Sequence, residues 1–151
     1  MDTTVKPQGC TNIKLRQLTR RVARYYEAEV GKTGLKNTQY SLLSYVYKLG
    51  TLRPGDLARA MNIEASTLSR NLKPLIAAGW LSLDAGADGR SRLVSITPAG
   101  REKRQEAQRR WRVAQESVNQ ALGVERVIEL HALLDDCMER LAPLNEGEGD
   151  E

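Results

Sequence analysis

Residues 52–97 constrain this chain most, because they predict two short helices followed by a β-hairpin. Leu57, Ala58 and Met61 recur at the spacing of one helical face. Asn62 comes next, and Asn tolerates the left-handed backbone that a tight turn requires. The first helix is therefore expected to close at Asn62, with a second helix following at once.

The second predicted helix has one face that can pack and one that is small and polar. Its apolar residues are Leu68, Leu72, Leu75 and Ile76, and its polar residues are Ser66, Ser69, Arg70 and Lys73. Gly79 is expected to end it. Two alternating runs, 80–84 and 92–96, then flank the turn-rich segment 85–91, which predicts a hairpin with a basic tip.

This order of elements favours binding to duplex DNA. The polar helix face fits a major groove, and the protruding loop can reach a neighbouring minor groove. Taken singly, each element could equally be a solvated helix face or an ordinary hairpin. Joined within one compact unit, they favour nucleic-acid binding, and the main alternative is a winged helix that binds proteins without specific DNA binding.

The same residues carry a resemblance to a known family. The motifs are Leu57-Ala58, Thr67-Leu68-Ser69-Arg70, Leu75 through Gly79-Trp80-Leu81, Asp88-Gly89-Arg90-Ser91 and Ile96-Thr97-Pro98-Ala99-Gly100. In these motifs and in element order, from about residue 12 to residue 141, the chain resembles the MarR family of transcriptional regulators.

The resemblance implies a homodimer that binds a pseudo-palindromic operator, acts as a repressor, and is released by a small ligand or by cysteine oxidation. It also implies that Asp88 orients the wing arginine. The DNA-binding residues expected on this basis are Ser66, Thr67, Ser69, Arg70, Lys73, Asp88, Arg90 and Arg92.

The charge is distributed unevenly along the 151 residues. The formal net charge is +4, but residues 125–151 contain nine acids against two arginines, a net of −7, which leaves +11 on residues 1–124. No apolar run reaches membrane-spanning length, and the start lacks a signal-peptide pattern. We therefore expect a cytoplasmic protein with no membrane partner, whose two cysteines are thiols rather than a disulfide.

The fold class expected is mainly α with a small β-hairpin wing. The segments are a flexible arm (1–11), N-terminal helices for dimerisation and linking (12–49), the winged helix-turn-helix (50–97), C-terminal dimerisation helices (98–142) and a disordered acidic tail (143–151). Apolar residues recur at near-heptad spacing on the first helix and on the last two helices. One small winged helix cannot cover all of this apolar surface. Packing against a second copy is the expected solution.

Local signals also predict individual helix ends. Asn37 or Thr38 can cap the second helix of the chain, whose wide apolar coverage predicts burial on several sides. Thr97 is expected to cap the long helix after the hairpin, with Pro98 at its first position. Gly123 is expected to interrupt that helix and to precede the last one.

Two hypotheses concern the signal that the protein would sense. An aromatic or acyl effector could contact the aromatic residues Tyr25, Tyr40, Tyr45 and Trp111, although core packing would equally explain each of them. Alternatively, Cys10 lies at the start of the first helix beside Lys14, where the helix dipole and positive field favour a thiolate. Cys137 lies on an apolar seam and is expected to be buried and inert.

One branch of the MarR family senses organic peroxides through a cysteine near the position of Cys10, held by tyrosines. This sequence has Lys14 where that branch offers a tyrosine, so Tyr25, Tyr26 or a tyrosine of the second helix would have to serve.

The sequence offers few residues that could carry out catalysis. His131 is the only histidine, which argues against a metal site or a histidine-based acid–base pair. We find no phosphate loop, no dinucleotide glycine pattern and no nucleophile elbow. We expect a protein that is not an enzyme and that uses no cofactor or metal.

Overall fold

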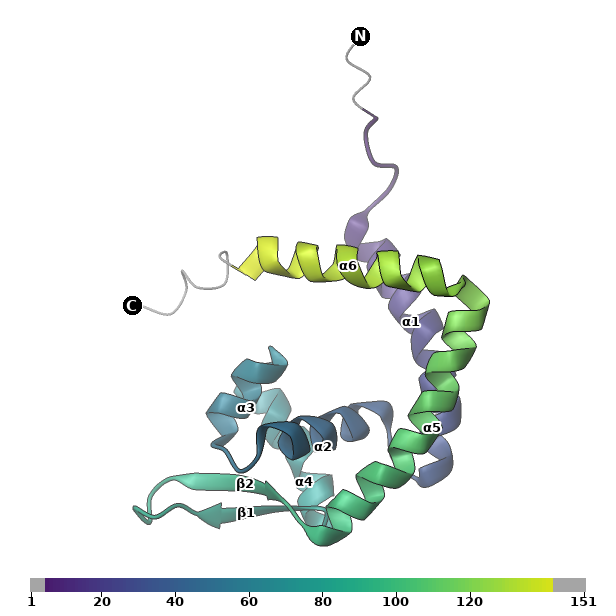
Figure 1. Cartoon of the computed structure of the whole chain (residues 1–151). Coiled ribbons are helices and arrows are strands. Elements are labelled where there is room, and N and C mark those ends of the chain that lie inside the picture. The colour runs from purple at the N-terminus through teal and green to yellow at the C-terminus, as the bar shows by residue number, and fades with distance from the viewer. Residues whose placement is uncertain (1–4, 143–151) are drawn as a thin grey trace, which may run out of the picture. The chain divides into compact units, whose positions relative to one another are not determined.

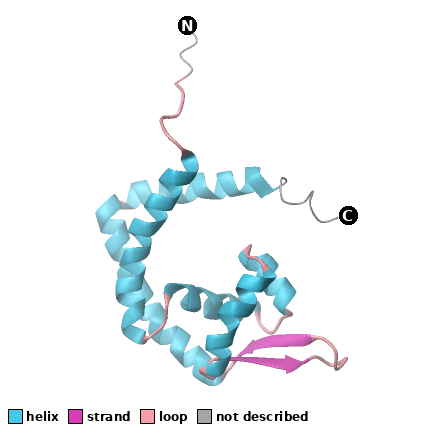
Figure 2. Ribbon diagram, turned by 180° about the vertical axis from the view of Figure 1, so that it is seen from behind, coloured by secondary structure: helices cyan, strands magenta, loops and turns pink. Residues whose placement is uncertain are grey.

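The computed structural model describes residues 5–142, and the chain is mainly helical with one antiparallel hairpin (Figures 1 and 2). The helices are α1 (Thr11–Val30), α2 (Asn37–Leu49), α3 (Pro54–Met61), α4 (Ala65–Ala77), α5 (Pro98–Leu122) and α6 (Val124–Leu141), with a 3₁₀ turn η1 (Gly31–Thr33) and strands β1 (Leu81–Ala85) and β2 (Arg92–Ile96). This confirms the predicted fold class. The predicted acidic tail lies outside the described residues.

The chain divides into two compact units, with the boundary inside α5 between residues 114 and 115. In the first unit, α2 packs against α3, α4 and β2 and forms the centre of the core (Figure 1). The side chains of Leu43, Leu57, Leu75 and Val94 there are fully buried. This core holds the helix-turn-helix and the hairpin together as one body.

The start of α2 differs by one or two residues from the predicted cap. The capping position is Lys36, whose N–H donates to Gln39 Oε1 at 2.9 Å and whose carbonyl accepts from the Tyr40 N–H at 3.0 Å. Asn37 and Thr38 already belong to the helix. The prediction of a cap at either residue is wrong, because the helix begins one residue earlier and the Gln39 side chain accepts from the N–H of the residue before it.

The end of α2 is less buried than predicted. Leu42, Leu43 and Val46 are buried, as a central helix requires, but Tyr47 and Leu49 are 47% and 48% exposed. The helix is therefore buried along one side and exposed on the other at its last turn.

The hairpin pairs β1 with β2 in the register Leu81↔Ile96 to Ala85↔Arg92, so the first strand begins one residue later than predicted. Leu52 forms an isolated bridge with Val94, through N–H···O distances of 3.2 and 2.8 Å. The chain that enters α3 is thus hydrogen-bonded to β2, which ties the hairpin to the helix-turn-helix.

The second unit contains the end of α5 and all of α6. Gly123 separates them with a φ of 87°, as predicted, and its N–H donates to the carbonyl of Asn119 at 2.8 Å. Along α6, Ile128, Leu133 and Met138 are more than 60% exposed. Cys137 is also exposed, so the prediction of a buried thiol is wrong for the single chain. Within that chain, most of the apolar residues along α6 stay uncovered.

Candidate nucleic-acid interface

Helix α4 presents the predicted polar face to solvent. Leu68, Leu72 and Leu75 are at most 4% exposed and anchor the helix to the core. The opposite side chains are all exposed, namely Ser66, Ser69, Arg70 and Lys73, whereas Thr67 is half-buried at the edge of the face. The exposed face therefore combines small hydroxyls with two cations, which suits contact with base edges and phosphates.

The turn before α4 closes α3 as the sequence predicted. Asn62 has a φ of 53°, and its N–H donates to the carbonyl of Arg59 at 3.1 Å. The Ile63 N–H donates to the carbonyl of Ala58 at 3.0 Å, which completes a Schellman motif. This turn sets the direction in which α4 leaves α3.

The end of α4 uses the same motif. Gly79 has a φ of 79° and donates to Ile76, while the Trp80 N–H donates to the carbonyl of Leu75 at 3.0 Å. Thr97 Oγ1 donates to the carbonyl of Gly79 at 2.6 Å. The exit of α4 is thus hydrogen-bonded to the residue that follows β2.

Thr97 also begins α5, as predicted. Its Oγ1 accepts from the Gly100 N–H at 3.0 Å, and Pro98 occupies the first helical position. A Cβ atom on Gly100 would overlap the Trp80 carbonyl, so this close approach requires glycine. Thr97 therefore caps α5 and, through its hydrogen bond to the Gly79 carbonyl, fixes the start of α5 against the end of α4.

Asp88 organises the tip of the hairpin. Its Oδ1 accepts from the Ser91 N–H at 3.0 Å, from the Ser91 hydroxyl at 2.8 Å and from the Arg90 N–H at 3.0 Å. These hydrogen bonds, with those of Ser91 the largest contribution, lower the pKa of the Asp88 carboxyl to about 2. The carboxylate holds the backbone of Arg90, whereas the Arg90 side chain stays exposed.

Arg92 is exposed at the first position of β2, paired with Ala85. The structure therefore brings Arg90 and Arg92 to one end of the hairpin, and the hydrogen bonds of Asp88 determine how that end is folded.

The four aromatic residues considered for an effector lie in different environments. Tyr40 is 7% exposed and belongs to the core, whereas Tyr25 and Tyr45 are 43% and 41% exposed. Trp111 is half-buried on α5, and its ring centroid lies 6.4 Å from that of Tyr26 on α1.

Tyr26 is a residue that sequence reasoning did not select for the effector. Burial raises the pKa of its phenol. The ion pair between Arg110 Nη1 and Glu29 Oε2, at 3.8 Å, joins the same two helices as the Tyr26–Trp111 contact. Helical periodicity could not reveal these pairs, because they depend on how two distant helices meet.

Cys10 is exposed and occupies the capping position of α1, with its carbonyl accepting from the Lys14 N–H at 3.1 Å. Tyr25 and Tyr26 lie about 22 Å further along the same helix at its usual rise of ~1.5 Å per residue. Within one chain, therefore, Tyr25 and Tyr26 lie too far from Cys10 to contact its thiol.

Residues 5–142 contain no group of three or more His, Cys, Asp and Glu side chains that could hold a metal ion. Over the same range, none of the helices combines the length and apolar character needed to cross a bilayer.

A helix-turn-helix joined to a hairpin with a basic tip defines the class of winged-helix DNA-binding regulators. The chain belongs to the MarR family of transcriptional regulators, and residues 33–91 match the model of that family.

Several known regulators are similar to this chain. The transcriptional regulator MosR of M. tuberculosis, solved in complex with DNA, is 32% identical with a TM-score of 0.73, over 87% of this chain and 98% of that chain. A probable transcriptional regulator from Pseudomonas aeruginosa is 27% identical with a TM-score of 0.77, over 85% and 96%. The uncharacterized HTH-type regulator YwoH of Bacillus subtilis is 28% identical over 93 residues, or 62% of this chain and 68% of its own length.

Proposed function

We propose that this chain is a homodimeric repressor that binds a pseudo-palindromic DNA operator and is released from it by a signal. The observation that carries the proposal is the exposed face of α4, followed in the chain by a hairpin whose tip Asp88 holds in shape. The similarity to MosR, which was solved with DNA bound, supports the same conclusion.

In this proposal, α4 enters the major groove and the hairpin reaches the minor groove. Ser66, Thr67, Ser69, Arg70 and Lys73 contact bases or phosphates from α4, and Arg90 and Arg92 contact the backbone and minor groove from the hairpin. Asp88 positions Arg90 without touching DNA, because its Oδ1 already accepts three hydrogen bonds from the loop.

The dimer is proposed from uncovered apolar surface. On α1, Leu15 and Leu18 are 47% and 36% exposed, and on α6 the side chains of Ile128, Leu133 and Met138 are exposed more fully. Exposed apolar residues repeated along a helix indicate a protein–protein contact. We propose that residues 12–49 and 98–142 supply the dimer contacts and residues 50–97 the DNA contacts.

The signal would act at the junction of the dimerisation and DNA-binding regions. Tyr25, Tyr40, Tyr45 and Trp111 are proposed to contribute contacts to a small aromatic or acyl effector. The alternative signal is oxidation of Cys10, whose thiol is exposed. Either signal would change the distance between the two α4 helices of the dimer. That distance must match DNA half-sites about 34–36 Å apart.

The experiment that tests the proposed function is selection of bound sequences from a random duplex pool, combined with sedimentation of the free protein. We expect a two-fold symmetric consensus and a dimer that is weakened by Leu133→Glu. Val5→Glu, at an exposed apolar position outside the proposed interface, is the matched control. Recovery of no consensus, together with weak and salt-insensitive DNA binding, would favour a protein-interaction module.

A further inference from the structure

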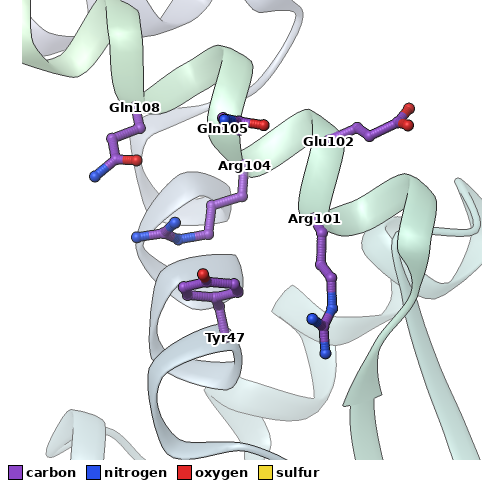
Figure 3. A pocket seen from close by; sticks show the side chains of 6 residues that line it. All are labelled: Tyr47, Arg101, Glu102, Arg104, Gln105 and Gln108. Atoms are coloured by element: carbon purple, nitrogen blue, oxygen red, sulfur yellow. The ribbon is translucent and has the colours of Figure 1, made fainter.

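A small pocket lies between the last turn of α2 and the first three turns of α5 (Figure 3). Its volume is about 250 Å³, and it is lined by Tyr47, Arg101, Glu102, Arg104, Gln105 and Gln108. None of these residues belongs to the proposed DNA-contact or effector sets. The pocket therefore needs an explanation of its own.

Two guanidinium groups share one aromatic ring in this pocket. The Arg104 Cζ atom lies 4.1 Å from the centroid of the Tyr47 ring, and the Arg101 Cζ atom lies 6.0 Å from the same centroid. Figure 3 shows Arg104 extended across the ring and Arg101 descending beside it. The ring stabilises both cations through its quadrupole, but it supplies no negative charge.

Within residues 5–142, neither arginine forms an ion pair, although neighbouring cations of α5 do. Lys103 pairs with Glu106 at 3.5 Å, and Arg110 pairs with Glu29 at 3.8 Å. Glu102 is the acid that lines the pocket, and Figure 3 shows its carboxylate directed away from Tyr47. The pocket thus concentrates two positive charges that the described part of the chain leaves uncompensated.

The Nε–H of Arg104 adds an independent indication of a missing partner. This nitrogen is buried and has no hydrogen-bond acceptor among the described residues. Buried donors are almost always satisfied, so this nitrogen has room for an acceptor from a water, an ion or another bound molecule. An acceptor entering the pocket would satisfy Arg104 and offset the repulsion between the two arginines.

We propose that this pocket binds the phosphate group of a small phosphorylated molecule. A phosphomonoester carries a charge between about −1.5 and −2 at neutral pH, which matches two arginines better than a monocarboxylate does. The Gln105 and Gln108 amides add further donors for its oxygens. Because Arg104 covers the face of Tyr47, recognition depends on charge and hydrogen bonds rather than on stacking with an aromatic ligand.

The test is a titration of the full-length, ¹⁵N-labelled protein with inorganic phosphate at constant ionic strength. It is followed through the backbone amide resonance of Gln105 in every variant and through the Arg104 Nε–H resonance wherever Arg104 is kept. We expect a saturable shift that neither chloride nor benzoate reproduces. Arg101→Gln and Arg104→Lys should each weaken phosphate binding by about tenfold, the usual effect of losing a charged hydrogen bond. Arg104→Lys keeps the charge, and Arg101 is exposed, so folding is expected to survive both changes.

Arg109→Gln is the matched control, because Arg109 is an exposed cation of α5 that does not line the pocket. Equal weakening by Arg109→Gln, or a shift that follows ionic strength alone, would overturn the proposal. So would an unchanged affinity in Arg101→Gln. If free protein ignored phosphate while Arg101→Gln lowered the salt dependence of duplex binding, the occupant would be a DNA phosphate and the small-molecule site would be wrong.

Discussion

The hydroxyl of Thr97 donates a hydrogen bond of 2.6 Å to the carbonyl of Gly79, and this contact links the end of α4 to the start of α5. The same oxygen accepts from the Gly100 N–H at 3.0 Å. The orientation of α4 is therefore coupled to that of α5 through the Thr97 side chain.

Gly100→Ala should destabilise the protein, because the added Cβ overlaps the Trp80 carbonyl next to this link. Overpacking of this kind costs about 1–3 kcal/mol. Gly55→Ala is the matched control, since Gly55 is also helical but has open space around it, and it should be neutral or slightly stabilising. Denaturant unfolding of both variants measures the difference, and equal stabilities would contradict the proposed clash.

The Asp88 carboxyl should stay ionised to unusually low pH. Its pKa is lowered from 3.8 to about 2, so the hydrogen bonds that it accepts favour the folded loop above pH 3.8, and this contribution is lost as the pH falls through about 2. A ¹³C titration of the Asp88 carboxyl measures the midpoint. Ser91→Ala removes one donor and should raise the midpoint toward 3.8, whereas an unchanged midpoint would remove the Ser91 hydroxyl as a cause.

Arg70 and Arg90 should differ in what they contribute to DNA binding. Arg70→Ala should relax base preference at one or two positions and cost about 1–3 kcal/mol if its contact is bidentate. Arg90→Ala should weaken binding to all sequences. It should also reduce the slope of log affinity against log salt concentration by about one unit. Lys6→Ala, at an exposed cation outside both proposed contact regions, is the control. Binding isotherms over a salt series decide the matter, and an unchanged slope in Arg90→Ala would remove the hairpin from the contact surface.

Cys10→Ser should separate the two proposed signals. If oxidation is the signal, an organic peroxide should release wild type from its operator but leave Cys10→Ser bound. Cys137→Ser is the matched control, because both thiols are exposed. Peroxide release that survives in Cys10→Ser would exclude this cysteine, and insensitivity of wild type would favour the aromatic or acyl effector.

The sequence alone predicted those features that depend on hydrogen bonds between near neighbours. The left-handed turn at Asn62, the cap at Thr97 and the break at Gly123 follow from the residue type at one position and the pattern beside it. The buried and exposed faces of α4 follow in the same way from helical period. These local signals were sufficient to predict the winged helix, because its elements are consecutive in the chain.

Only the tertiary structure decided which distant faces meet. Arg104 reaches Tyr47, Trp111 approaches Tyr26, and Gly100 must be small because Trp80 passes beside it. No local pattern marks these pairs, since each depends on the packing of two separately encoded elements. Packing likewise left the last turn of α2 exposed and Cys137 open to solvent, because an apolar seam specifies a face that can be buried but not the partner that covers it.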